Sequence, residues 1–307
     1  MKKLILAFLI ILFALTSKVV WSGDFSKGLD AFKRGDYTTA LSEWRLLATE
    51  QGHIGAQFNL GLMFDNGYGV PKDYKTAVKW YTKAADQENS GAQHNLGWLF
   101  ENGGYGIQKD KKIAVEWYTL AAEQGNAYSQ FNLGLMYRKG EGVLQDDKEA
   151  VKWYKLAAKQ GITDAQFNLG QMYRRGEGVS QDYKIAFEWF RLAADQGYSV
   201  AQHNLGSMFD NGNGVSQDKK EAAKWFRDAA EQGNSGAQYN LGLLYESGYG
   251  VLQDNIYAHM WGNISALNKY EDGHKLRDRV EKKMTVADIS VAQKLARECE
   301  KKEYKGC

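Results

Sequence analysis

A six-residue pattern, Ala/Ser-Gln-aromatic/His-Asn-Leu-Gly, occurs six times in this chain and limits the possible folds more than any other feature. The copies begin at Ala56, Ala92, Ser129, Ala165, Ala201 and Ala237, 36 residues apart except for one step of 37. A period of this length is typical of a solenoid, in which each repeat buries its apolar side only against its neighbours. Stacked repeats expose a long surface. We therefore expect a chain that binds other chains rather than one that catalyses a reaction.

Each repeat predicts two helices, called helix A and helix B here. In the first copy, apolar residues at spacings of three and four from Ala56 to Phe64 indicate an amphipathic helix A. A Gly-x-Gly loop should end it, because glycine adopts a positive φ without a Cβ penalty. The glycine pairs are Gly67/Gly69, Gly104/Gly106, Gly140/Gly142, Gly176/Gly178, Gly212/Gly214 and Gly248/Gly250.

An aspartate at a fixed distance after each loop predicts the N-cap of helix B. These residues are Asp73, Asp110, Asp146, Asp182, Asp218 and Asp254. Glu149 and Glu221, three residues further on, predict capping boxes in two repeats. A Gln-Gly pair should end helix B, and Glu88 takes the glycine position in one copy, which predicts a strained or differently shaped turn there.

The core is expected to combine small alanines, which let helices approach closely, with one tryptophan in each helix B. The tryptophans are Trp80, Trp117, Trp153, Trp189, Trp225 and Trp261. An asparagine in each helix A is expected to bond to loop backbone: Asn59, Asn95, Asn132, Asn168, Asn204 and Asn240.

The two ends of the repeat region read as caps. Residues 24–52 form a shortened repeat, and beyond Trp261 the period fails while helices are still expected at 274–284 and 286–302. Cys299 and Cys307 are the two cysteines of the chain. In an oxidising compartment they predict a disulfide that closes the C-terminal tail, the alternative being two unrelated thiols.

The N-terminus reads as a secretory signal. Lys2 and Lys3 precede an apolar run from Leu4 to Leu15, and small residues follow before residue 22. The run is shorter than the roughly 20 residues of a membrane helix, so we expect cleavage rather than stable membrane insertion, an uncleaved anchor being the alternative. The expected organisation is a signal peptide at 1–22, a repeat solenoid at 23–270 and a helical cap at 271–307, in a periplasmic or secreted protein.

Charge argues against nucleic-acid binding. The whole chain has 39 basic and 37 acidic residues, and the signal removes Lys2, Lys3 and Lys18 without removing an acid. A near-neutral chain without a basic arm offers little phosphate neutralisation.

The repeat resembles the Sel-one-like repeat, a longer-looped relative of the tetratricopeptide repeat. The resemblance covers about residues 24–270 and rests on the Ala-x-x-x-Leu-Gly stretch, the Gly-x-Gly-Val loop, the aspartate, and the Ala-x-x-Trp and Ala-Ala of helix B. It implies an all-α, right-handed solenoid of about seven helix-turn-helix repeats with a helical C-terminal cap. It also implies an adaptor in protein complexes, as in exported bacterial members.

The positions of helix A that vary between copies form a stripe about 100° wide, opposite the invariant positions. By the tetratricopeptide resemblance this stripe lines the concave groove. One row of it is always ring-bearing: Phe58, His94, Phe131, Phe167, His203 and Tyr239. A second row is Leu62, Trp98, Leu135, Gln171, Ser207 and Leu243.

The third row, at the edge of the stripe, changes sign along the chain. Asp65 and Glu101 are followed by Arg138 with Lys139 and Arg174 with Arg175, and then by Asp210 and Glu246. Aromatic and arginine side chains commonly anchor protein interfaces, so the central repeats are expected to bind an acidic or carboxylate-bearing segment of a partner. Two alternatives are that the ring row packs on the neighbouring helix and that the arginines offset a helix dipole.

We expect no enzyme, cofactor or metal site. His94 and His203 stand three repeats apart, roughly 50 Å along a stack of helices packed at 8 to 10 Å, too far to share a metal or a proton. Ser216 and Lys219 match the Ser-x-x-Lys spacing of penicillin-recognising enzymes, but no Lys-Thr-Gly follows. A cell-wall-binding or β-lactam-hydrolysing protein is the alternative, since some exported relatives with cysteines inside the repeats have such links.

Overall fold

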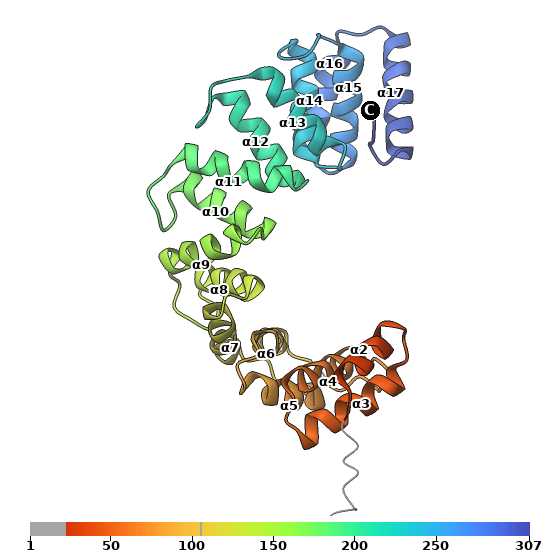
Figure 1. Cartoon of the computed structure of the whole chain (residues 1–307). Coiled ribbons are helices and arrows are strands. Elements are labelled where there is room, and N and C mark those ends of the chain that lie inside the picture. Colours follow the sequence, from red (N-terminus) through yellow and green to blue (C-terminus); the bar gives the residue numbers. More distant parts are fainter. Residues whose placement is uncertain (1–22, 105) are drawn as a thin grey trace, which may run out of the picture. The chain divides into compact units, whose positions relative to one another are not determined.

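The computed structural model describes residues 23–104 and 106–307, and within these ranges it contains helices α2 to α17 and no strand (Figure 1). The predicted all-α helical-repeat fold is confirmed. The predicted signal peptide lies outside the described residues. The described residues form two compact units, one that ends at Ser129 and one from Gln130 to Cys307.

Helices A and B alternate as the period predicts. Helix A is α4 (Ile54–Asn66), α6 (Ser90–Asn102), α8 (Ala127–Lys139), α10 (Thr163–Arg175), α12 (Ser199–Asn211) and α14 (Ser235–Ser247). Helix B is α5 (Tyr74–Ala85), α7 (Lys111–Glu123), α9 (Asp147–Lys159), α11 (Tyr183–Asp195), α13 (Lys219–Ala230) and α15 (Asn255–Leu267). α2 (Phe25–Lys33) and α3 (Tyr37–Glu50) precede them, and α16 (Glu271–Glu281) and α17 (Val286–Lys301) follow.

All six predicted aspartate N-caps are confirmed. Asp73, for example, accepts hydrogen bonds from the backbone N–H groups of Lys75 at 3.0 Å and Thr76 at 3.2 Å. The other five aspartates accept from the same two positions of their own helices. These bonds satisfy N–H groups that have no partner within the helix.

The predicted capping boxes are wrong, because the two glutamates turn to lysines on their own helices. Glu149 Oε2 accepts from Lys152 Nζ at 3.0 Å, and Glu221 lies 3.8 Å from Lys224. A reciprocal box forms instead at the start of α17, between Thr285 and Asp288.

The loop glycines have the expected positive φ, with one shift of position. In the second repeat Gly103, with φ 72°, follows the helix in place of the predicted Gly104, because this loop carries the extra residue of the 37-residue step. The turn at Glu88 is strained as predicted, since a non-glycine residue there has φ 62°.

In the first five repeats, the ring at the centre is the residue after the tryptophan. Tyr81, Tyr118, Tyr154, Phe190 and Phe226 are buried. The prediction of core tryptophans holds for Trp153 and Trp261 and is wrong for the other four, which are half-buried at the border of the core: Trp80, Trp117, Trp189 and Trp225. A one-residue change of position rotates a helical side chain by about 100°, which accounts for the difference.

Glutamines that sequence reasoning missed join successive repeats. Gln166 donates to the carbonyl of Ala158 at 3.1 Å and accepts from Gln196 at 2.7 Å. The same pattern joins Gln202 to Ala194 and Gln232, and Gln238 to Ala230. Each buried glutamine thus satisfies a carbonyl near the end of the preceding helix B.

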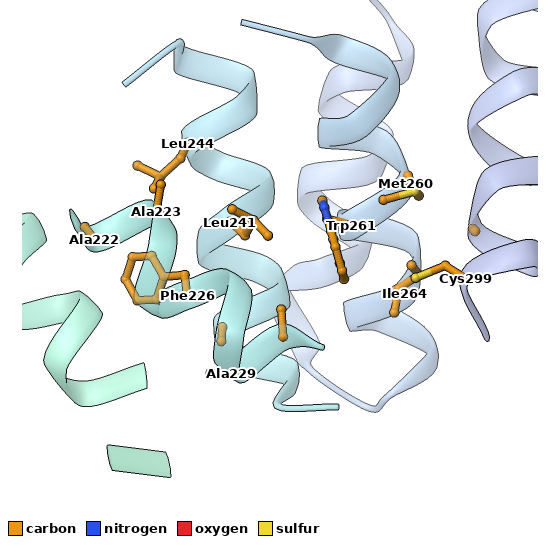
Figure 2. Close-up of a cluster of buried hydrophobic side chains, with 13 residues drawn as sticks. Ala222, Ala223, Phe226, Ala229, Leu241, Leu244, Met260, Trp261, Ile264 and Cys299 are labelled. Carbon is orange, nitrogen blue, oxygen red and sulfur yellow. The ribbon is translucent and has the colours of Figure 1, made fainter. Parts of the chain in front are cut away.

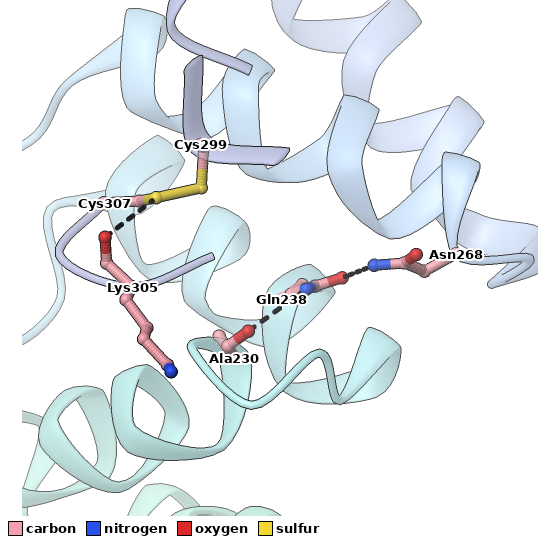
Figure 3. Close-up of a disulfide and its surroundings, with 6 residues drawn as sticks. All are labelled: Ala230, Gln238, Asn268, Cys299, Lys305 and Cys307. Carbon is pink, nitrogen blue, oxygen red and sulfur yellow. Dashed lines mark hydrogen bonds between the residues drawn. A yellow bond between two sulfur atoms is a disulfide. The ribbon is translucent and has the colours of Figure 1, made fainter. Parts of the chain in front are cut away.

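The sixth repeat, after which the array ends, has Gly262 where the other five have the central ring. Leu276 of α16 takes that place, and a Cβ built on Gly242 would lie 2.7 Å from its Cδ2. α17 packs on α15, where Cys299 joins the cluster around Trp261 and Ile264 (Figure 2). Figure 3 shows the disulfide between Cys299 and Cys307 and, beside it, Asn268 donating to Gln238.

Candidate functional site

The structure places four of the predicted groove residues in the first compact unit and nine in the second. Those of the first unit are Phe58, Leu62, His94 and Trp98. Those of the second are Phe131, Leu135, Arg138, Phe167, Gln171, Arg174, Arg175, His203 and Tyr239. Each unit is therefore a separate candidate surface.

The rings of the first row are half-buried, because each one packs against another aromatic ring of its own repeat. Phe131 lies 5.9 Å from Tyr154 between ring centroids, and Phe167 lies 5.7 Å from Phe190. Phe58, His94 and His203 have the same arrangement with Tyr81, Tyr118 and Phe226, whereas Tyr239 meets Tyr270. Some of these rings have a second ring neighbour, Tyr198 for Phe167 and Tyr128 for His94, and every ring of the row keeps part of its surface accessible to solvent.

The two histidines of this row are structural. His94 Nδ1 lies 2.8 Å from Ser129 Oγ, and His203 Nε2 lies 3.0 Å from Asn240 Nδ2. Burial lowers the pKa of both imidazoles, so the neutral form is favoured.

Two residues of the second row differ from the other predicted groove residues. In the first unit, the side chain of Trp98 is the most exposed of the four, and in the second unit Gln171 has a buried oxygen without a partner among the described residues. Trp98 is 44% exposed. Gln171 is half-buried, and its Oε1 atom is buried without a hydrogen-bond partner.

The charged side chains of the third row lie beside the para position of the buried ring in helix B, where a tyrosine carries its hydroxyl. Tyr81 donates to Asp65 at 3.1 Å and Tyr118 to Glu101 at 2.8 Å. In the third repeat Arg138 stands beside the hydroxyl of Tyr154, whose pKa burial raises to about 12. Phe190 and Phe226 have no hydroxyl for Arg174 and Asp210 to meet.

Two of the three predicted arginines already bind one carboxylate. Arg138 lies 3.4 Å from Glu177 Oε2 and Arg175 lies 3.3 Å from Glu177 Oε1. Sequence reasoning missed Glu177, although the chain carries the signal: the middle residue of Gly-x-Gly is glutamate only in the two repeats with arginine in the third row.

Arg174 differs from its neighbours. Its side chain is half-buried, and its Nε atom is buried without a hydrogen-bond partner. Burial, and then the charge of Arg175, lower the pKa of this guanidinium. Its cationic form is therefore poorly solvated, which a bound anion would relieve.

The prediction that the asparagines bond to loop backbone is wrong for Asn168, Asn204 and Asn240. Asn168 accepts from Arg138 of the preceding repeat at 3.1 Å, and Asn240 lies against His203. Asn204 donates to the carbonyl of Val200 in its own helix. Asn168 and Asn240 thus bond across the junction between successive repeats.

Within residues 23–104 and 106–307 no helix is both long and apolar enough to cross a bilayer. The same residues contain no group of three or more histidine, cysteine, aspartate or glutamate side chains placed to hold a metal ion.

Paired helices repeated at a 36-residue period, joined by side-chain bonds from one repeat to the next, define an α-helical repeat protein. The chain belongs to the Sel1 repeat family, whose model matches residues 54–89, 90–126, 127–162, 163–198, 199–234 and 235–270. Sel1 repeats generally mediate protein–protein interactions, and the family is typically non-catalytic.

Two solved structures are similar over most of this chain. One is c5321, described as a protective antigen of uropathogenic Escherichia coli with an SLR fold, 37% identical, with a TM-score of 0.77 and 95% of this chain covered. This chain spans 63% of that antigen's length. The other is a Sel1 repeat protein from Oxalobacter formigenes, 31% identical, with a TM-score of 0.62, covering 78% of this chain and 94% of that one.

A curated relative matches only a short segment. The DAP3-binding cell death enhancer 1 of Rattus norvegicus is 41% identical over 51 residues, which are 17% of this chain and 10% of the rat protein.

Proposed function

We propose that the chain is an exported, non-catalytic adaptor that binds an acidic segment of a partner protein on the helix A surface of its third and fourth repeats. The observation that carries the proposal is Arg174, a half-buried cation whose Nε atom has no hydrogen-bond partner. A partner carboxylate would supply the missing counter-charge, and charge-assisted bonds to arginine are among the strong ones in interfaces.

The neighbouring side chains suit a peptide ligand. Phe131 and Phe167 offer partly exposed ring surface in successive repeats. Gln171, one helical turn before Arg174, can donate its amide N–H groups to a partner carbonyl. Glu177 pairs with Arg138 and Arg175, so Arg174 is the arginine of this surface that is left for the ligand.

Export rests on the N-terminal sequence, with its basic start, apolar run and small residues before position 22. The disulfide between Cys299 and Cys307 supports an oxidising compartment. The periplasm or the cell exterior is the proposed location. Fractionation with a C-terminal tag, and mass spectrometry of the mature N-terminus, would test both steps.

The binding proposal is tested by crosslinking pull-down from the envelope fraction of the native organism. Arg174→Gln removes the charge and keeps most of the side-chain length, and it should abolish capture of the specific partner. Arg191→Gln on α11 is the matched control, since Arg191 is exposed and lies 3.9 Å from Asp195. Equal capture of every partner by folded Arg174→Gln protein would refute the site. Sedimentation with peptidoglycan, or β-lactam turnover, would favour the alternative function instead.

A further inference from the structure

Helix α9 carries lysine at all four outward-facing positions of its exposed face. These are Lys148, Lys152, Lys155 and Lys159, all exposed. In four other repeats the residue equivalent to Lys159 is acidic: Asp86, Glu123, Asp195 and Glu231. The fold therefore does not require a basic residue at position 159. An all-lysine face is specific to the third repeat.

The lysines surround an apolar hollow. The hollow measures about 540 Å³ and is lined by Val151, Leu156, Tyr173 and Val179 together with the four lysines. Leu156 is 39% exposed, although it lies in the middle of the helix. A volume of this size accommodates one or two large apolar side chains of a partner, and an exposed apolar site with a charged rim is typical of interaction surfaces.

Most of this positive charge is not neutralised within the molecule. Lys152 pairs with Glu149 at 3.0 Å and lies over the ring of Trp153. Over the described part of the chain, the other three lysines of the face have no ion pair. Lys148 lies in the first turn, where the helix dipole disfavours a cation, but lysine occupies the same position in four other repeats. Lys155 and Lys159 are therefore the residues that distinguish this face.

We propose that the lysine face of α9 is a second docking site, which binds an acidic amphipathic helix of a partner protein. Its apolar side chains would enter the hollow at Leu156 while carboxylates line up with the lysines, which span about 16 Å along the helix axis. In the next helix B the four equivalent positions hold two basic and two acidic residues, Lys184, Glu188, Arg191 and Asp195, so the surface with an excess of positive charge is one helix wide. That width suits a single helix better than an anionic bilayer, which attracts broad basic surfaces.

The test uses the full chain and a synthetic, fluorescein-labelled 18-residue peptide with leucine at one helical face and glutamate at the other. Fluorescence anisotropy should show saturable binding that weakens about tenfold or more in Lys155→Glu/Lys159→Glu. Leu156→Asn should weaken it without a charge change. The matched control, Lys220→Glu/Lys224→Glu on α13, alters the net charge equally and should bind within about twofold of the unsubstituted chain.

Four outcomes would overturn the proposal. They are no saturable binding by the unsubstituted chain, equal binding by Lys155→Glu/Lys159→Glu, equal binding of a scrambled peptide of the same composition, and lysine-dependent binding of phosphatidylglycerol vesicles in place of the peptide. Circular dichroism melts check that the exposed substitutions leave the fold intact. Arg174→Gln should leave peptide binding here unchanged, which separates this site from the proposed adaptor surface.

Discussion

Gly134 of α8 lies flat against the ring of Tyr154 in α9, so close that a Cβ built on Gly134 would stand 2.7 Å from Cδ1 of the ring. Gly170 and Phe190 are related in the same way in the next repeat, at 2.8 Å. The invariant glycine of the six-residue pattern therefore marks the closest approach of helix A to helix B. It has an ordinary helical φ, so close contact rather than backbone conformation requires it.

Gly170→Ala is expected to lower the free energy of unfolding by about 1 to 3 kcal/mol, because overpacking outweighs the better helix propensity of alanine. Urea unfolding followed by circular dichroism measures the change. Gly91→Ala is the control, since its Cβ would meet Phe58 at 3.3 Å and should cost less. Phe190→Leu should rescue part of the loss, and simple additivity of the two changes would contradict the proposed contact.

Gln166→Met should cost about 1 to 3 kcal/mol of stability, since it removes the hydrogen bond from Gln196 and leaves the buried carbonyl of Ala158 without its partner. The double-mutant cycle with Gln196→Ala should give a coupling energy of at least about 0.5 kcal/mol. A cycle between Gln166 and the distant Gln232 serves as control and should give none. Coupling that is equal in the two cycles would show that the glutamines act through something other than their direct bond.

The lowered pKa of the Glu246 carboxyl predicts that the chain becomes less stable in acid. Hydrogen bonds from Arg279 and Lys283 lower the pKa of this carboxyl from 4.5 to about 2. Because its pKa is lower in the folded chain than in the unfolded one, the ionised Glu246 carboxylate stabilises the fold above pH 4.5. This stabilisation is lost as the pH falls from 4.5 towards 2. With solvent screening at the exposed Arg279, it should amount to about 1 kcal/mol.

Thermal unfolding of the unsubstituted chain and Glu246→Gln between pH 7 and pH 3 measures this loss. The variant should be less stable at pH 7 and should approach the unsubstituted chain near pH 3. Glu188→Gln on α11, an exposed position, should keep the original pH dependence. A constant gap between Glu246→Gln and the unsubstituted chain at all pH values would rule out the ionisation of Glu246 as the cause.

Reduction of the disulfide between Cys299 and Cys307 should destabilise the C-terminal cap by about 2 kcal/mol, in accordance with the short loop that the bond closes. The tail also holds Tyr304, which donates to Asn268 at 3.0 Å. Hydrogen exchange with and without dithiothreitol should show faster exchange in α17 and its tail. The Cys299→Ser/Cys307→Ser variant is the control and should not respond to the reductant; equal exchange in the oxidised and reduced chains would contradict a stabilising bond.

The sequence determined the elements of this protein because each boundary has a local chemical cause. Aspartate caps and glycine ends act on the nearest turn of backbone, so helix bounds could be predicted without knowledge of packing. The errors were local as well: the loop of the second repeat gained a residue, and Glu149 found a lysine on its own helix.

Tertiary structure decided what the repeats present to one another and to solvent. In the first repeat the fully buried ring is Tyr81 rather than the predicted Trp80. Likewise, Asn168 bonds to Arg138 rather than to loop backbone. Glu177 meets Arg138 across 39 positions of sequence. The residue pattern hints at this ion pair, but only the structure shows that Arg138 and Arg175 share one carboxylate while Arg174 Nε has no hydrogen-bond partner among the described residues. The residues shared by all repeats determine the common backbone. Contacts between successive repeats depend instead on pairs of residues that differ from one repeat to the next.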